Sequence, residues 1–244
     1  MKLLTHNVYW FQGKPSRWGS ERVAEAPEVL AALAKLYAAE SVDVLCLQEV
    51  HRSDLAQHLA RELGMASWLH APGGRLPDYG GAVLSRSEAL LRDRTTGENR
   101  VPHERVHIRA SLAYRGERLE LAVVHLPSDR YAGSGDAGHL ARVNELTQVL
   151  AASPRPNIVA GDMNGKPDSP PCRLLREAGY VDAAVATRDP SLQGKRVDYI
   201  WLDETYAGRL VRFAQLDRGD FCRTSPDGKA WTLSDHPPLL VELR

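Results

Sequence analysis

Cysteine is scarce in this sequence. The chain has 244 residues and only three cysteines, Cys46, Cys172 and Cys222, which lie far apart and form no C-x-x-C pair. An odd number of widely spaced cysteines argues against a disulfide framework and against a zinc ribbon. We therefore expect reduced thiols.

The sequence also lacks an excess of either charge and lacks any long apolar segment. Lysine plus arginine and aspartate plus glutamate each number 31, so composition does not indicate a basic nucleic-acid binder or an acidic disordered chain. No stretch approaches the roughly 20 apolar residues that a membrane span needs, and residues 1–10 lack the features of an export signal. We expect a cytoplasmic protein with no membrane span, acting as a monomer.

What the sequence does contain is a series of short strand-like runs separated by a few helical patterns. Its 43% hydrophobic and 25% charged residues are an ordinary globular composition, and its length suits one α/β domain of residues 1–244. Many strands with few helices predict mixed or antiparallel sheets packed together, with helices outside. Strands are predicted within 2–10, 42–50, 80–86, 105–114, 117–126, 157–164, 196–203, 209–216 and 237–244, and helices within 23–37, 53–63, 140–150 and 168–178.

One motif points in a misleading direction. "HERVH", His103 to His107, matches the H-E-x-x-H pattern of zinc peptidases, in which a helix places both histidines on one face. Here the apolar residues from Val106 to Leu112 alternate, which predicts a strand. Histidines four apart on a strand are about 13 Å apart, too far to share an ion. We therefore expect no zinc site at this motif.

Polar residues recur where the predicted strands begin or end. Any one of them has a simple structural explanation, such as a turn, a cap or an exposed end. Because a carboxylate buried without a partner is costly, so many at strand ends in one domain predict that they converge on one site. Oxygen-rich ligands without cysteine suit Mg²⁺ or Mn²⁺ better than zinc. The residues are Asn7, Gln48, Glu49, His125, Asp162, Asn164, Asp198, Asp235 and His236.

In this order the motifs resemble those of the endonuclease/exonuclease/phosphatase superfamily, the DNase I-like proteins. The segments that carry the resemblance are "LQEV", "VHLP", "GDMN", "RVDYI" and "SDHPPL". The match runs from Asn7 to the last predicted strand. The resemblance implies a four-layer α/β sandwich, in which two mixed β-sheets lie face to face and helices flank them. It also implies metal-dependent hydrolysis of phosphoester bonds.

The resemblance, combined with the chemistry of the side chains, suggests a role for each residue. Glu49 is expected to bind the metal ion, with help from Asn7 and Asp235. Asp162, oriented by Asn164, would position and deprotonate the attacking water.

Two histidines complete this expected site. Asp198 would hold the ring of His236 and raise its pKa, so that an imidazolium faces the phosphoryl oxygens. His125 would contact the phosphate or assist the leaving oxygen. An alternative makes His236 the general base and Asp162 its helper, and the sequence does not separate the two schemes.

The substrate is less well defined by the sequence. A phosphodiester, either nucleic acid or a small molecule, is the main expectation, and a phosphomonoester or a phospholipid diester is the alternative. The segment after Asn164, "GKPDSPP", resembles the N-x-x-P-x-S-P branch that contains sphingomyelinase-like and deadenylase-like members. A catalytically inactive binding module remains a further alternative. Aromatic residues in expected loops could stack on a base or sugar, or could anchor the loops: Trp18, Tyr79, Tyr131 and Trp231.

Overall fold

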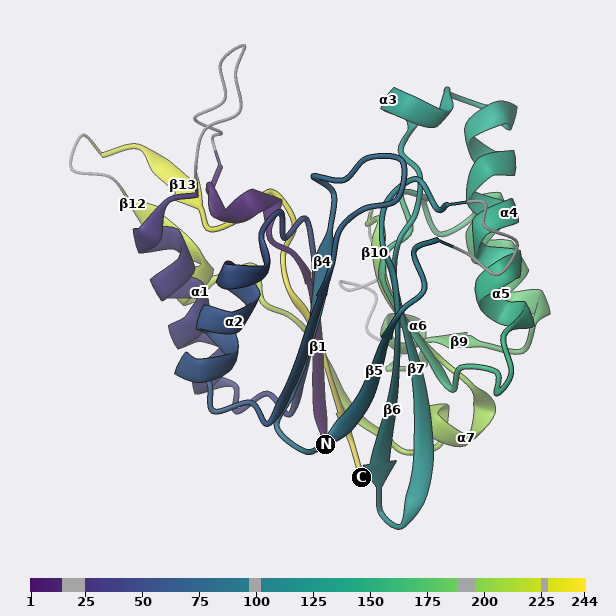
Figure 1. The fold of residues 1–244 in the computed structure, drawn as a ribbon, viewed down its shortest axis with the longest axis horizontal. Coiled ribbons are helices and arrows are strands. Elements are labelled where there is room, and N and C mark those ends of the chain that lie inside the picture. Colours follow the sequence, from purple (N-terminus) through teal and green to yellow (C-terminus); the bar gives the residue numbers. More distant parts are fainter. Residues whose placement is uncertain (15–24, 97–101, 188–195, 225–227) are drawn as a thin grey trace.

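The structure is a sandwich of two six-stranded sheets with helices on its two outer sides (Figure 1). It is a computed structural model that describes residues 1–14, 25–96, 102–187, 196–224 and 228–244. The first sheet has the order β11 (Leu210–Gln215), β14 (Leu239–Leu243), β1 (Lys2–Asn7), β2 (Val44–Gln48), β4 (Gly81–Ser85) and β3 (Ser67–Ala71). The second has the order β5 (Ala89–Asp93), β6 (His107–Tyr114), β7 (Glu117–His125), β8 (Ile158–Asp162), β10 (Asp198–Leu202) and β9 (Val181–Asp182).

Each sheet is mixed, because each combines one parallel pair with antiparallel neighbours. The parallel pairs are β1 with β2 in the first sheet and β7 with β8 in the second. A separate two-stranded ribbon joins β12 (Cys222–Thr224) to β13 (Ala230–Thr232). The expected four-layer α/β sandwich is therefore confirmed.

Helices cover the outer face of each sheet. In Figure 1, α1 (Pro27–Ala39) and α2 (Ser53–Glu62) lie on one side, and α4 (Asp136–Ala151) and α5 (Pro170–Glu177) lie on the other. The shorter helices are α3 (Asp129–Ala132), α6 (Ala183–Ala186) and α7 (Glu204–Ala207), with 3₁₀ turns η1 (Tyr9–Phe11) and η3 (Gly219–Phe221). No helix among the described residues is long and apolar enough to cross a membrane.

One part of the core lies between the sheets, where alternate residues of facing strands meet. Leu3, Cys46, Ile108 and Val241 belong to this buried layer. Two further apolar clusters lie between each sheet and its helices. Side chains alternate between the two faces of a strand. In the central strands one face meets the other sheet and the opposite face meets helices, so these strands have nearly continuous apolar sequences.

Every predicted strand and helix region contains a corresponding element. The strands that sequence reasoning missed are β3, β5, β9, β12 and β13. These strands lie at sheet edges or in the two-stranded ribbon, and they are two to five residues long with exposed positions. Such segments carry little of the apolar pattern that marks a strand.

The H-E-x-x-H motif is not helical, as expected, but the expected spacing of its histidines was wrong. Strand β6 begins only at His107, and the preceding residues form neither helix nor strand. The ring centroids of His103 and His107 are therefore only 5.1 Å apart. Among the described residues, these histidines do not belong to any group of three or more side chains placed to bind a metal.

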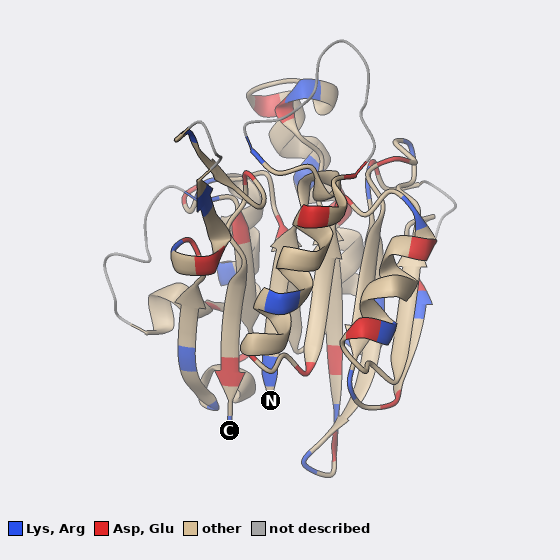
Figure 2. Ribbon diagram, turned by 90° about the vertical axis from the view of Figure 1, so that its left-hand side faces the viewer, with Lys and Arg blue, Asp and Glu red and all other residues tan. Residues whose placement is uncertain are grey.

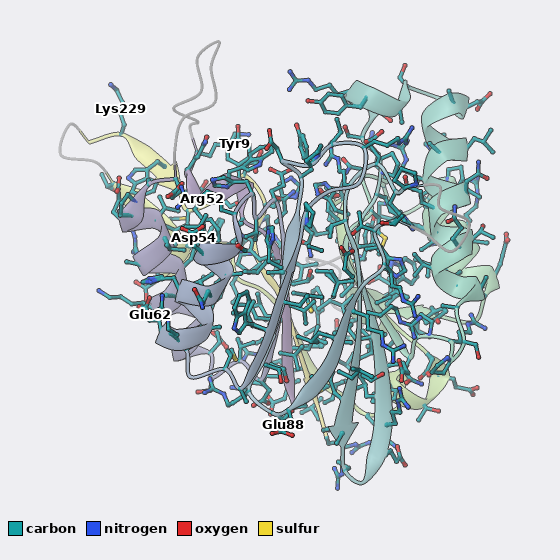
Figure 3. All side chains as sticks on the ribbon, in the orientation of Figure 1. Tyr9, Arg52, Asp54, Glu62, Glu88 and Lys229 are labelled. Atoms are coloured by element: carbon teal, nitrogen blue, oxygen red, sulfur yellow. The ribbon has the colours of Figure 1, made fainter. Side chains whose placement is uncertain are left out.

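Charged side chains are mixed in sign on the face formed by α1 and α2. Figure 2 shows basic and acidic residues interspersed along the elements that face the viewer. At the start of α2, Arg52 and Asp54 form an exposed pair with 2.7 Å between Nη2 and Oδ2 (Figure 3). The described part of this face therefore lacks the single-sign field that attracts a nucleic-acid backbone.

Candidate active site

Three of the predicted residues lie side by side on neighbouring strands of the second sheet. His125 ends β7 and Asp162 ends β8, and the two are register partners in the parallel pair. Asp198 begins β10 and is the antiparallel partner of Asp162. Because register partners occupy the same level of a sheet, the hydrogen bonds of the strands bring these three side chains together.

Gly161 makes this alignment possible. Its backbone has φ +133, and a Cβ atom at this position would lie 1.9 Å from the carbonyl oxygen of Val124. Only glycine fits so close an approach of two backbones. The glycine of "GDMN" therefore sets the distance between β7 and β8 immediately before His125 and Asp162.

The first sheet contributes Asn7 and Glu49. Asn7 ends β1 beside Gln48 of β2, and Glu49 follows with φ +60, a conformation that is unfavourable for a residue other than glycine. The Nδ2 atom of Asn7 donates to Oε1 of Glu49 at 3.2 Å and to Oδ2 of Asp162 at 3.2 Å. Asn7 therefore connects the polar ends of the two sheets.

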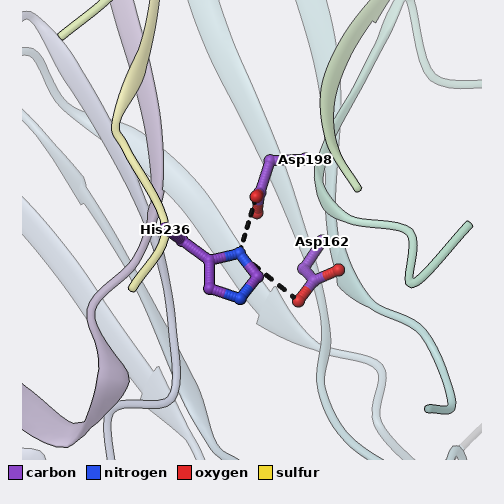
Figure 4. A group of neighbouring side chains, drawn as sticks. All are labelled: Asp162, Asp198 and His236. Carbon is purple, nitrogen blue, oxygen red and sulfur yellow. Dashed lines mark hydrogen bonds and ion pairs between the residues drawn. The ribbon is translucent and has the colours of Figure 1, made fainter. Parts of the chain in front are cut away.

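His236 is held by Asp198 and also faces Asp162, as Figure 4 shows. Its Nδ1 atom is 2.6 Å from Oδ2 of Asp198 and 3.9 Å from Oδ2 of Asp162. Burial alone would lower the pKa of His236, but the carboxylates of Asp198, Asp162 and Asp235 raise it well above its ordinary value. His236 is therefore an imidazolium at neutral pH.

The loop that carries His236 is fixed by buried hydrogen bonds. Nε2 of His6 donates to the carbonyl oxygen of His236 at 2.9 Å, and Nδ1 of His6 accepts from the Tyr37 hydroxyl at 2.6 Å. The Ser234 hydroxyl donates to the Asn7 carbonyl at 2.7 Å and accepts from the His236 amide at 3.2 Å. His6 and Ser234 thus position the imidazolium. The sequence did not predict this role for either residue.

The two aspartates differ in their electrostatic environment. Burial raises the pKa of Asp198 to about 6 and the charge of Asp162 adds to this, while the His236 imidazolium opposes it. For Asp162, burial acts in the same direction, but His125, His236 and Arg105 together hold its pKa well below its usual range. The Oδ1 atom of Asp162 also accepts a hydrogen bond from the backbone N–H of Asn164 at 2.8 Å. Asp162 is therefore a carboxylate at neutral pH.

Arg105 is a buried member of the site that the sequence analysis missed. Its guanidinium donates to Nε2 of His125, lies 3.9 Å from Oε1 of Glu49 and 3.6 Å from Oε1 of Glu104, and covers the Tyr79 ring at 4.3 Å. It lies within "HERVH", between the two histidines of that motif. A lone arginine at the start of a predicted strand gives no signal from which its burial could have been inferred.

Arg105 also decides the state of His125. Burial lowers the pKa of His125 to about 4, and the neighbouring guanidinium contributes to the decrease. Nε2 of His125 lies beside both the Arg105 guanidinium and Oδ2 of Asp162, the latter at 3.2 Å. The lowered pKa makes His125 a hydrogen-bonding group rather than a cation at pH 7.

The oxygen atoms near Glu49 fit a hard cation. Burial raises the pKa of Glu49 to about 8, partly offset by Arg105 and His236. Within the described residues, Oε2 of Glu49 and Oδ1 of Asp235 are buried without a hydrogen-bond partner. Such oxygens are costly when left unpaired, and a divalent cation would satisfy them.

A second group of possible ligands is better explained by direct hydrogen bonding. Asp162, Asp198 and His236 each offer an atom within 4.8 Å of the others. However, Nδ1 of His236 and Oδ2 of Asp198 are 2.6 Å apart, which leaves no room for an ion between these two atoms. This acidic and imidazole cluster is therefore a hydrogen-bonded set beside the oxygens of Glu49.

The aromatic residues suggested for substrate stacking have different surroundings. Trp18 lies outside the described residues. Tyr131 lies in helix α3 rather than in a loop, is 45% exposed, and its hydroxyl is 3.0 Å from that of Tyr79. Trp231 lies in β13 and packs against the core beside Gly13. Tyr131 is the better placed of the two for contact with a ligand.

Comparisons with known proteins agree with the fold. The model of a family described as the Endonuclease/Exonuclease/phosphatase family matches residues 4–236. A search of curated proteins gave no match.

Solved structures share the fold over the whole chain. Sphingomyelinase C from Streptomyces griseocarneus has a TM-score of 0.67 at 17% identity, and the alignment covers 100% of this chain and 99% of that one. A mannosyl-6-phosphatase from Bacteroides thetaiotaomicron has a TM-score of 0.68 at 14% identity, with coverage of 100% and 99%. A family protein from the same bacterium has a TM-score of 0.68 at 14% identity, with coverage of 100% and 97%.

Proposed function

Because the chain belongs to the endonuclease/exonuclease/phosphatase family, we propose that it is an Mg²⁺- or Mn²⁺-dependent enzyme that hydrolyses a phosphodiester. The observation that carries the proposal is the contact of the His236 imidazolium with Asp198 and its approach to Asp162. A fixed cation beside a fixed carboxylate can bind a phosphoryl oxygen and orient a water molecule at the same time.

His236 is proposed to bind the phosphoryl oxygens through its ring N–H groups. Asp198 holds Nδ1, so Nε2 remains to donate to the substrate, and the imidazolium stabilises negative charge that develops in the transition state. Its raised pKa makes His236 a poor general base at neutral pH. This supports the scheme in which Asp162 acts on the water over the one in which His236 does.

Asp162 is proposed to orient the attacking water and to accept its proton. Asn164 and Asn7 donate to its two oxygens, which fixes the carboxylate plane. A carboxylate with a depressed pKa is a weak base, so positioning of the water accounts for most of its effect. His125, neutral and bonded to Arg105, is proposed to contact the phosphate or the leaving oxygen.

The metal ion is proposed to bind Glu49, with Asn7 and Asp235 as further ligands. When bound, a divalent cation supplies positive charge that neutralises the phosphoryl oxygens. Binding by Asn7 requires its amide oxygen to turn toward Glu49, because Nδ2 now donates there and Oδ1 accepts from the Tyr9 amide at 3.1 Å.

The choice of a diester is tested by a substrate panel with Mg²⁺ or Mn²⁺. The panel contains a bis-aryl phosphodiester, an aryl monoester, single-stranded and duplex DNA, RNA and a phospholipid. We expect hydrolysis of at least one diester and its loss with a chelator. Exclusive hydrolysis of the monoester would instead indicate a phosphomonoesterase, and the solved relatives include both a sphingomyelinase and a mannosyl-6-phosphatase by name.

Substitutions test the assignment of residues on the best substrate. Glu49→Gln and Asp162→Asn should each lower kcat at least about 100-fold, the usual effect of losing a metal ligand or a positioned base. The control is Glu62→Gln, an exposed glutamate at the end of α2 (Figure 3), which should leave kcat unchanged. Equal activity of Glu49→Gln and the parent protein would contradict the metal assignment. No hydrolysis on the whole panel and no metal binding would favour an inactive binding module.

Three further predictions concern the chain as a whole. A single catalytic domain of residues 1–244, a monomeric state and a cytoplasmic location remain predictions. Sedimentation of the purified protein tests the second, and fractionation of cells tests the third.

A further inference from the structure

A cavity that takes no part in the proposed reaction lies on the outer face of the second sheet. Along β6, Ile108, Ala110 and Leu112 face the core between the sheets. The alternate residues His107, Arg109 and Ser111 therefore point to the opposite face. They line a cavity of about 70 Å³ together with β5, β7 and the end of α4. None of the proposed catalytic or metal-binding residues lines it.

The walls of the cavity are strongly basic. Among the described residues, the side chains that line it include one carboxylate, that of Glu120, and four arginines: Arg92, Arg94, Arg109 and Arg118. Glu120 is already paired, with Oε2 3.1 Å from Arg109 and Oε1 2.6 Å from Arg118. Four positive charges against one negative charge attract an anion and repel a cation.

Among the described residues, three that line the cavity each have a buried nitrogen atom without a partner. Within the described residues, Nε2 of His103, Nε2 of His107 and Nη1 of Arg109 lack a hydrogen bond. All three side chains are more than nine-tenths buried. Because an unpaired buried polar atom is rare and costly, three around one cavity indicate a ligand that supplies acceptor atoms.

These groups are held in place by the surrounding structure. Nη2 of Arg109 donates to Glu120 and, at 2.7 Å, to the carbonyl oxygen of Pro154. Nδ1 of His103 is 3.2 Å from Oε2 of Glu145. Fixing Nη2 of Arg109 leaves its Nη1 for a ligand, so this donor is preorganised.

Size and chemistry favour a tetrahedral oxyanion. About 10–15 Å³ of such volume holds one water molecule, so this cavity has room for several waters or for one phosphate group. An oxyanion would accept from Arg109 and from the Nε2–H tautomer of His107. A zinc ion is disfavoured by the arginines and by the absence, among the described residues, of a ligand group that includes these histidines.

We propose that this cavity is a second anion site that binds phosphate, as the free ion or as the terminal group of a small phosphate ester, apart from the catalytic centre. Residues 103–107 run between the two sites, because His103 and His107 line the cavity while Arg105 contacts His125 and Glu49. The site could be filled while the catalytic centre is empty, since the two share no lining residue.

The experiment is a titration of the full-length protein with inorganic phosphate, followed by the imidazole signals of each histidine in NMR. Sodium chloride at the same ionic strength is the control. The signals of His103 and His107 should shift on binding, and the shifts should persist in His236→Ala, which weakens binding at the catalytic centre only. Glycerol 3-phosphate in place of phosphate shows whether the site also accepts an ester.

Substitutions then test the lining. Arg94→Gln and Arg109→Gln should each weaken phosphate binding at the His107 signal by about tenfold or more, because each removes a charged donor. Arg61→Gln, which removes the same charge from the exposed end of α2, should change nothing. Arg94 is exposed, so its variant is informative even if Arg109→Gln does not fold.

Two results would overturn the proposal. One is no shift of His103 and His107 at phosphate concentrations that saturate the His236 signal. The other is a shift that disappears in His236→Ala, or one that Arg94→Gln and Arg61→Gln weaken equally.

Discussion

Arg105 is the residue on which most of the buried charge in the catalytic centre depends. Its side chain is only 5% exposed and lies against the carboxylates of Glu49 and Glu104 and the imidazole of His125. Removing a guanidinium from such a place leaves carboxylates without a counter-charge and frees the His125 ring. Arg105 therefore acts on the site through its neighbours.

Substitution of Arg105 should reduce activity strongly. We expect Arg105→Gln to lower kcat by about 10²–10³, the usual effect of losing one preorganised donor. Arg105→Lys keeps the charge but loses the planar fork, so it should recover only part of the rate. Steady-state kinetics on the best substrate, with thermal unfolding as a check of folding, gives the measurement.

The matched control for this prediction is Arg75→Gln. Arg75 is 57% exposed and reaches one of the same carboxylates from outside, since it lies 3.7 Å from Glu104 and 3.8 Å from Glu145. Its loss should leave kcat nearly unchanged, because exposed pairs contribute little. A fully active Arg105→Gln enzyme would show that the arginine has only a structural role.

At this scale the sequence reveals residue types but not their partners. Asp162 and His236 were predicted because a carboxylate and an imidazole are conspicuous at strand ends. Arg105 and His6 were missed, because arginine is common on surfaces and His6 lies inside an apolar run. Only the packed structure shows that His6 is buried and bonded to the His236 carbonyl.

Among the elements, the β7–β8 pair determines the geometry of the site. The two strands run parallel with His125 opposite Asp162, and the close approach at Gly161 precedes both residues. A change in this spacing would move both side chains at once. The pairing of these strands is therefore the element on which the site depends most.

Gly161→Ala should unfold or strongly destabilise the protein. The added methyl group would lie 1.9 Å from the Val124 carbonyl oxygen, and φ +133 is unfavourable for alanine. We expect a loss on the order of 3 kcal/mol or more in the free energy of unfolding, since strain and steric overlap add. Urea unfolding followed by circular dichroism measures it.

Gly116→Ala separates strain from overlap. Gly116 has φ +80 in the turn between β6 and β7, but a Cβ atom there would meet nothing within 4 Å. Gly116→Ala should lower the free energy of unfolding by about 1–2 kcal/mol, which is the cost of the left-handed conformation alone. Similar losses for the two variants would mean that β7 and β8 can move apart without penalty.

The elements also show where sequence patterns stop being informative. Alternation predicted β6 correctly from His107 onward, but it does not report that residues 103–106 turn instead of continuing the strand. That turn brings His103 within 5.1 Å of His107 and buries Arg105. It is fixed by tertiary contacts, such as the 2.6 Å hydrogen bond from the Glu104 amide to Glu145 of α4. Long-range contacts of this kind leave no local signal.

For the whole molecule, the layers were predictable and the strand order was not. Apolar runs and helical spacing define which segments form sheets and which cover them. The order β5–β6–β7–β8–β10–β9 depends on which strands pair with each other. Residues that influence this pairing, such as Gly161, cannot be recognised from the pattern of hydrophobic residues. The site was predictable as a set because its members lie at the ends of central strands.

Three buried histidines, His6, His107 and His125, should each make the folded molecule less stable as pH falls below about 6.5, the ordinary pKa of histidine. Burial lowers the pKa of His6 to about 3 and that of His125 to about 4. Burial, with His103, Arg109 and Arg94 nearby, also lowers the pKa of His107 well below its ordinary value. At these three side chains the unfolded chain binds protons that the folded chain does not, so their contribution to stability decreases as pH falls. The raised pKa values of Glu49 and Asp198 act in the opposite direction.

His107 offers the clearest test, because it lies outside the proposed catalytic centre. The charged and titratable groups near it are His103, Arg109 and Arg94, and the change His107→Gln leaves all three in place. Each buried neutral histidine contributes a slope of up to about 1.4 kcal/mol per pH unit to the free energy of unfolding. The variant should therefore show a shallower decrease than the parent as pH falls below about 6.5. Urea unfolding at several pH values gives the slopes, and the control is His58→Gln on the exposed face of α2, 3.1 Å from Glu62. If His107→Gln and His58→Gln had the same slope as the parent protein, the neutral state of buried His107 would be contradicted.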